Sequence, residues 1–254
     1  MFRVASHAYS VEAMSRHGFA RKTEAHPGHR SVGGGLARAA VFGMSDGLVS
    51  NVSLVIGFAG SGVDSSLVRL AGVAGAIAGA VSMAAGEWVS ISAQNELVLR
   101  ELEVERRELV VNAKAEQAEL AAMYRDHGMR DITADQAAAD VMRSPAAALA
   151  VHAREEFGID PHDLPSAMQA AALSLLCFII GAMLPVLPWL VGGGTGAKAS
   201  SIGLGVAAAA GLGWTIGQFA DRSRLRSALR QVIILLVACT VTYLIGRLLH
   251  VNIA

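Results

Sequence analysis

Glutamates at helical spacing stand out in the middle of this 254-residue chain. Four of them form two ExxE pairs, and they are Glu105, Glu108, Glu116 and Glu119. On an α-helix these side chains would share one stripe, where like charges repel one another. A row of unpaired carboxylates suits a divalent cation, because such ions prefer oxygen ligands. The stripe therefore predicts a metal site, and the alternative is an ordinary solvated acidic face.

A second group with metal-binding chemistry lies in the segment VHAREEFG. His152 and Glu156 are four residues apart, so one helix would direct both side chains at the same ion. An imidazole added to carboxylates fits Fe²⁺, Mn²⁺, Co²⁺ or Zn²⁺ better than Ca²⁺ or Mg²⁺. The alternative is a surface histidine beside glutamates.

Two acids fall in otherwise apolar sequence. Asp46 occurs in FGMSDGLVSN, and Glu87 occurs in SMAAGEWVS, one helical turn after Met83. Charged groups at membrane depth are costly and are usually functional. The thioether of Met83 could be a soft ligand for a transition metal, although a methionine that fills a gap in the core is the simpler interpretation.

The elements that carry these residues follow from the distribution of charge. Only 17% of the residues are charged, against about 25% in a typical soluble domain. Charge-free runs occupy 47–63, 70–86, 164–197, 199–220 and 231–246. A spanning helix needs about 20 mostly apolar residues, so we predict five spans at 39–60, 68–93, 167–190, 200–219 and 229–249.

Between the second and third predicted spans lies an insert, residues 96–163, with 15 acidic and 8 basic side chains. Its acidity argues against nucleic acid as a partner and favours cations. Span 2 is predicted to continue as one helix through 92–124, because no Pro or Gly interrupts it. A second helix is expected after Thr133 as N-cap, and a third over 146–157, ending at Gly158.

Lys and Arg residues indicate the orientation in the membrane. Eighteen lie in the N-terminal tail, the insert and the 221–230 turn, against three on the opposite side. The positive-inside rule then places the N-terminus and the insert in the cytoplasm and the C-terminus outside. We expect a disordered tail over 1–35, spans 1 and 2 within 36–95, and spans 3 to 5 within 164–254. Glycine-rich stretches such as 71–86 predict close packing of the spans, including packing against a second copy.

Together, DGLVSNVSLVIG, SMAAGEWVS, the doubled ExxE and HAREEFGID resemble the vacuolar iron transporter (VIT) family over residues 36–254. The resemblance implies a homodimeric transporter of ferrous iron, often also of manganese, that moves metal out of the cytosol in exchange for protons. It also implies that Asp46 and Met83 line the transport path. We assign Glu87 to the same path, because charged groups at membrane depth are usually functional. Metal in the insert would be bound by Glu105, Glu108, Glu116, Glu119 and Glu156. Plant members have a Met-Met pair where this chain has His152 and Ala153, which affects the expected ion preference.

The sequence therefore predicts an all-α integral membrane protein with five transmembrane helices and a cytoplasmic three-helix metal-binding insert. We expect a divalent-metal antiporter of the cell (inner) membrane, a homodimer in lipid, with Fe²⁺ or Mn²⁺ as its ion and no organic cofactor. Two other classes stay open at this stage. One is a membrane-bound di-iron oxidase, although the E-x-x-H pairs typical of such bundles are absent from the sequence. The other is a metal sensor or structural membrane protein that does not transport.

Overall fold

The computed structural model of the protein describes residues 35–161 and 163–249, which are helical apart from short connections. The helices are α1 (Gly35–Gly60), α2 (Ser65–Val111), α3 (Ala113–Asp126), α4 (Asp131–Met142), α5 (Pro145–Phe157), α6 (Ala167–Met183), α7 (Leu187–Val191), α8 (Gly194–Phe219) and α9 (Arg224–Leu248). The tail predicted over 1–35 lies outside the described residues except for Gly35.

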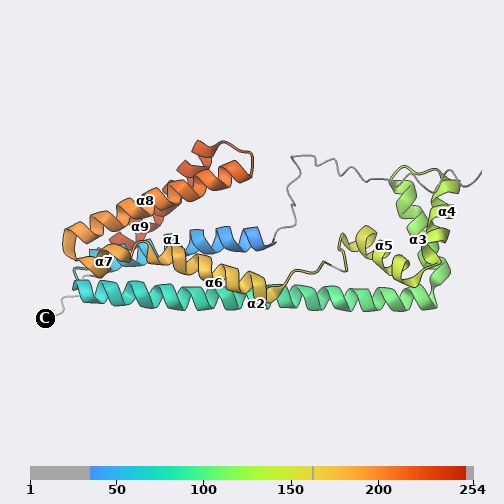
Figure 1. Ribbon diagram of the computed structural model, residues 1–254, viewed down its shortest axis with the longest axis horizontal. Helices are drawn as coiled ribbons and strands as arrows, with labels where there is room; N and C mark the ends of the chain where they lie inside the picture. The colour runs from blue at the N-terminus through green and yellow to red at the C-terminus, as the bar shows by residue number, and fades with distance from the viewer. Residues whose placement is uncertain (1–34, 162, 250–254) are drawn as a thin grey trace, which may run out of the picture. The chain divides into compact units, whose positions relative to one another are not determined.

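Helix α1 is the centre of an apolar bundle and packs against α2, α6, α8 and α9 (Figure 1). Its residues Leu48, Val52 and Ile56 form a buried cluster with Ala209 of α8 and Leu235 of α9. These α1 positions are four residues apart and therefore share one face of the helix. The bundle thus fixes which side of α1 is buried and which side is left for other contacts.

Glycine lets α1 and α6 touch backbone to backbone. A Cβ built on Gly47 would lie 2.3 Å from the carbonyl oxygen of Phe178, and one on Gly181 would lie 2.4 Å from that of Met44. No side chain fits at either position without moving a helix. Close approach through small residues is typical of helices that pack inside a membrane.

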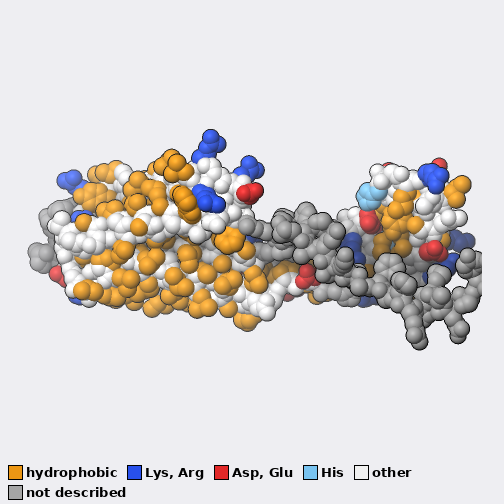
Figure 2. Space-filling model, turned by 45° about the horizontal axis from the view of Figure 1, so that its top comes forward, with side chains coloured by type: hydrophobic (Ala, Val, Ile, Leu, Met, Phe, Trp, Pro, Cys, Tyr) orange, Lys and Arg blue, Asp and Glu red, His pale blue; other side chains and the backbone are white. Residues whose placement is uncertain are grey.

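Four of the described helices, α1, α2, α8 and α9, are long and apolar enough to cross a membrane. The protein is therefore a multi-pass membrane protein. Large apolar side chains cover the outside of the bundle (Figure 2), as expected of a surface in contact with lipid.

The third predicted span, 167–190, is not one continuous helix. Helix α6 has 17 residues and is followed by a break at 184–186 and the five-residue α7. Pro185 has no N–H to donate, and the N–H of Val186 bonds to the carbonyl of Met183. At 1.5 Å per residue α6 alone is about 26 Å long, so the prediction of five spans rests on α6 together with the residues that follow it.

Helix α2 continues for 47 residues and carries the chain from the bundle into the insert, where α3, α4 and α5 gather (Figure 1). The prediction of one helix through 92–124 was wrong, because α2 ends at Val111 and α3 begins at Ala113. The prediction that Thr133 caps the next helix was also wrong, since α4 begins at Asp131. The third insert helix agrees with its predicted bounds to within one residue.

Candidate metal centre

Four metal-ligating side chains converge in the insert: Glu105, Glu116, His152 and Glu156. Each offers one ligand atom, and these atoms all lie within 4.8 Å of one another. Nδ1 of His152 is 3.1 Å from Oε1 of Glu156, with which it shares a hydrogen bond. The same nitrogen is 3.1 Å from Oε1 of Glu105 and 3.8 Å from Oε2 of Glu116. A nitrogen donor is thus surrounded by three carboxylates.

The break after Val111 makes this convergence possible. In a straight helix, Glu105 and Glu116 would be separated by about 16 Å along the axis, too far apart to bind a common ion. Instead, Asn112 has φ −118° and ψ 28°, and its N–H bonds to the carbonyl of Glu108 as α2 ends. The chain then changes direction into α3, and Glu116 comes within reach of Glu105.

Helix α5 supplies the other two ligands, and both of its ends are well defined by the sequence. The hydroxyl of Ser144 accepts a hydrogen bond from the N–H of Ala147, and Pro145 occupies the first helical position. Gly158 ends the helix at φ 66°, in the left-handed region that glycine adopts readily. His152 and Glu156 lie four residues apart on this short helix and direct their side chains to the same place.

The cluster is buried and short of positive charge. Glu105 and Glu116 are each 6% exposed, and His152 is fully buried. Within the described parts of the chain, no Lys or Arg forms an ion pair with any of the three carboxylates. Although Oε1 of Glu105 lies 3.1 Å from Nδ1 of His152, the hydrogen bond of that nitrogen is to Glu156. Oε1 of Glu105 and Nε2 of His152 therefore form no hydrogen bond with the described residues. Buried acids without a counter-charge are unstable unless they bind a proton or a cation.

The pKa values of the buried glutamates are raised, as expected of acids that lack a counter-charge. Burial, followed by the charge of Glu156, raises the pKa of Glu105 to about 7. Burial and then the charge of Glu119 raise the pKa of Glu116. Near neutral pH a proton therefore occupies Glu105 part of the time, and a divalent cation would compete with that proton for its oxygens.

Two predicted ligands lie outside the convergent group. Glu108 and Glu119 are exposed, although both contribute to the raised pKa of Glu116. The predicted stripe treated all four ExxE glutamates as equivalent, but the break at Asn112 buries one from each pair. Glu108 and Glu119 form an acidic margin around the buried pair.

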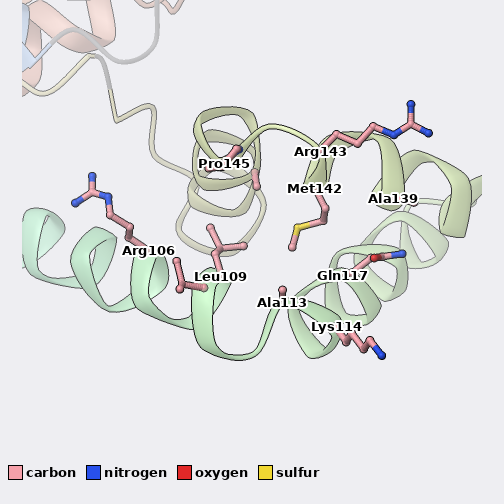
Figure 3. Close-up of a pocket in the computed structure, with 11 residues that line it drawn as sticks. Arg106, Leu109, Ala113, Lys114, Gln117, Ala139, Met142, Arg143 and Pro145 are labelled. Atoms are coloured by element: carbon pink, nitrogen blue, oxygen red, sulfur yellow. The ribbon is translucent and has the colours of Figure 1, made fainter.

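A hollow beside the break is not part of this cluster. It has a volume of about 390 Å³ and is lined by Leu109, Met142 and Pro145 together with three basic residues, Arg106, Lys114 and Arg143 (Figure 3). Positive side chains would repel a cation from this hollow. The break therefore separates a basic, apolar side from the acidic cluster.

In the membrane bundle, Asp46 and Met83 line one pocket between α1 and α2. Its volume is about 410 Å³, and Phe178 of α6 also lines it. Glycines at 75 and 79 form much of the α2 wall. The structure thus brings together the carboxylate and the thioether that the sequence singled out.

Glu87, the third predicted residue of the transport path, does not line that pocket. Its Oε1 lies 3.3 Å from a guanidinium nitrogen of Arg38 near the start of α1. Sequence reasoning did not single out Arg38, nor Asn51, which lines the pocket and is 2% exposed. The signal for Asn51 was available, because an amide in a charge-free run is expected to be costly unless it has partners.

Comparison with known proteins agrees with the motifs. Residues 37–247 match the VIT family. The chain is 29% identical to vacuolar iron transporter 1 of Oryza sativa subsp. japonica over 219 residues, covering 86% of this chain and 87% of that protein. It is 27% identical to vacuolar iron transporter 1 of Arabidopsis thaliana, covering 85% of this chain and 87% of that protein. It is also 34% identical to vacuolar iron transporter homolog 2 of Oryza sativa subsp. japonica, and the match covers 83% of this chain and 89% of that protein.

The family match covers most of the chain, including the doubled ExxE, the aspartate of the first span and the buried His–Glu pair. This chain is therefore a member of the VIT family.

Proposed function

We propose that this protein exports divalent transition-metal ions, Fe²⁺ or Mn²⁺, from the cytosol in exchange for protons. The insert captures the ion, and the pocket between α1 and α2 passes it across the membrane. Membership of the VIT family makes the chain a metal transporter and not an enzyme.

The observation that carries the proposal is the buried group of Glu105, Glu116, His152 and Glu156. Three carboxylate oxygens and one imidazole nitrogen form a mixed set of donors that suits Fe²⁺, Mn²⁺, Co²⁺ or Zn²⁺. The ion would replace the shared protons and neutralise the acids. Iron is the first candidate because the similar proteins are named as iron transporters.

The pocket between α1 and α2 contains the side chains needed to pass a metal ion in exchange for a proton. Asp46 can carry either a proton or part of the charge of a metal ion, but it carries one of them at a time. Met83 adds a soft, neutral contact on the opposite wall. Alternating occupation of Asp46 by proton and metal would couple the two fluxes, and a second copy of the chain would close the open side of the pocket.

The same proposal includes the topology. With α6 and the residues up to Val191 acting as the third span, the chain crosses the membrane five times, the insert is cytoplasmic and the C-terminus is outside. The excess of Lys and Arg on the side of the insert supports this orientation. Ala138, the first choice for a labelled cysteine, is fully buried, so the test uses the exposed Thr133 of the insert instead. A cysteine at that position should react with an impermeant reagent only after the cells are permeabilised, and labelling in intact cells would contradict the orientation.

The test is metal flux by the full-length protein in proteoliposomes with a pH gradient, for Fe²⁺ under anaerobic conditions and for Mn²⁺, Co²⁺ and Zn²⁺. We expect flux that depends on the gradient and release of protons in the opposite direction. Metal binding without flux would favour a sensor, and consumption of O₂ on addition of Fe²⁺ would favour an oxidase. Either result would contradict the proposal.

A further inference from the structure

The side-chain amide of Asn51 is held between three helices of the bundle. Asn51 lies on α1 and is 2% exposed. Its Nδ2 donates to the carbonyl oxygen of Gly72 on α2 at 3.1 Å and to that of Ala182 on α6 at 2.5 Å. Both protons of the NH₂ group are thereby used.

The orientation of this amide is set by its neighbours. Ala182 lies at the end of α6, and the N–H of Val186, which would continue the helix by bonding to it, bonds to Met183 instead. Of the two carbonyl oxygens that Nδ2 reaches, that of Ala182 therefore lacks its helical donor, whereas Gly72 lies inside α2. Only the NH₂ side of the amide can donate to either oxygen. Oδ1 must point away from them, and it has no hydrogen-bond partner among the described residues.

The unpartnered oxygen lies at the wall of the Asp46–Met83 pocket. A Cβ built on Gly75 would lie 3.1 Å from Oδ1 and 2.5 Å from Cδ2 of Leu54. All of these residues line the pocket. The glycine leaves space next to the oxygen, and the end of a flexible leucine side chain occupies the same neighbourhood.

The position of Asn51 along α1 places it after Asp46. Five residues correspond to about 7–8 Å along a helix, in the direction of the turn between α1 and α2. Buried polar groups are nearly always paired, and an unpaired one calls for an explanation. Packing explains the NH₂ side of Asn51 but leaves its oxygen without a function.

On the basis of the proposed function, we propose that Oδ1 of Asn51 is a further metal ligand in the transport path, which the ion reaches after Asp46. Rotation of Leu54 would open the oxygen to the pocket. A neutral amide oxygen is a hard donor for divalent cations and carries no proton to be displaced. The two hydrogen bonds of Nδ2 would keep the oxygen directed at the path, as outer partners do for metal ligands.

The first test compares Asn51→Asp with Asn51→Leu in the full-length protein. Both substitutions remove the two N–H donors, but only aspartate keeps a side-chain oxygen that can bind the ion. We expect Mn²⁺ flux per inserted protein to fall about tenfold or more in Asn51→Leu and to stay within about threefold of the wild type in Asn51→Asp. An equal loss in both variants, or no loss in Asn51→Leu, would show that Asn51 is structural only.

The second test leaves Asn51 unchanged and covers its oxygen. Gly75→Ala should raise the half-saturating Mn²⁺ concentration about tenfold. Gly86→Ala is the matched control on the same helix, because no atom lies within 4 Å of a Cβ there, and it should behave like the wild type. Adding Leu54→Ala to Gly75→Ala relieves the clash with leucine but leaves the oxygen covered, so the defect should persist.

These outcomes separate the two proposals. Recovery of wild-type flux in the double variant, or no defect in Gly75→Ala, would overturn the Asn51 ligand while the transporter stands. Absence of flux in the wild-type protein would instead contradict the proposed function, and the ligand with it.

Discussion

The two candidate metal sites of this protein differ in nearly every respect that determines how tightly an ion is bound. The insert offers three carboxylates and an imidazole from three helices, all close together and mostly buried. The membrane pocket offers one carboxylate and one thioether on facing helices. Affinity for a divalent cation rises with the number of charged ligands. The first arrangement suits capture of a scarce ion, and the second suits an ion that must also leave.

The sites differ equally in how their ligands are held. The insert cluster depends on a change of chain direction at Asn112 and on a short, capped α5. The pocket lies between two long helices whose contact is lined with glycine. A site formed by a local break is specified by a few residues. A site between whole helices can change when the helices move, which is what alternating access requires.

The largest expected effect comes from removing the single charge of the pocket. Asp46→Asn keeps the size of the side chain but can neither release a proton nor balance the charge of an ion. We expect flux in proteoliposomes to fall to the level of protein-free liposomes while calorimetry shows unchanged metal binding by the insert. The control is Asp221→Asn, an exposed residue at φ 51°, a conformation that asparagine tolerates. Wild-type flux in Asp46→Asn would make Asp46 structural.

The next largest effect is expected from substitutions in the insert, which test which of its glutamates bind metal. Glu105→Gln should lower the affinity of the full-length protein for Mn²⁺ by about 10- to 100-fold, because a buried ligand loses its charge. Glu119→Gln, which changes an exposed carboxylate outside the convergent group, should change the affinity by less than about threefold. Equal effects of the two substitutions would favour the solvated stripe over the buried cluster.

Metal binding by the insert should also depend on pH. Since burial raises the pKa of Glu105 to about 7, protons compete with the ion below that value. We expect Mn²⁺ affinity to fall by about tenfold per pH unit below 7. Glu105→Gln should remove this dependence, and an unchanged slope in that variant would assign the proton to another group.

The same raised pKa has a consequence for stability. Between the ordinary value of 4.5 and about 7, the folded protein binds more protons at Glu105 than the unfolded chain does. Raising the pH through this window therefore favours unfolding of the metal-free protein. Thermal unfolding monitored at pH 5, 6 and 7 should show a falling Tm without metal, and added Mn²⁺ should raise the Tm most at pH 7.

The smallest effect concerns the soft contact in the pocket. Met83→Leu conserves volume and removes the sulfur. Flux of Fe²⁺ and Co²⁺ should fall by a few-fold more than flux of Mn²⁺, the hardest of the three ions. Competition between the ions in one liposome preparation measures the ratio directly. An unchanged ratio would leave Met83 as a packing residue.

The positions of the long apolar helices along the chain were largely predictable from the sequence. Charge-free runs locate α1, α2, α8 and α9, because apolar length is the dominant requirement for crossing a membrane. The end of α5 was predictable because Gly158 is a strong local signal. The division of α6 from α7 was not predicted, although Pro185 and Pro188 were available to indicate it.

The insert shows why the break in the helix and the grouping of the glutamates could not be predicted from the sequence. Residues 92–124 contain no Pro or Gly, so local propensity favours a single helix. The break at Asn112 accompanies packing of Leu120 and Ala121 in α3 against Ala138 in α4. Such contacts between distant residues override propensity, and they decide that Glu105 and Glu116 are buried while Glu108 and Glu119 are not.

Helix α2 runs without interruption from the wall of the pocket to the metal cluster. Met83 and Glu105 lie on this one helix, separated by about 33 Å at 1.5 Å per residue. No single step spans such a distance, so an ion must leave one site entirely before it meets the other. The helix nevertheless holds the two sites at a fixed separation, so an ion released by the insert begins its diffusion about 33 Å from the pocket. The insert would therefore matter most when free metal is scarce, and an abundant supply would make it dispensable.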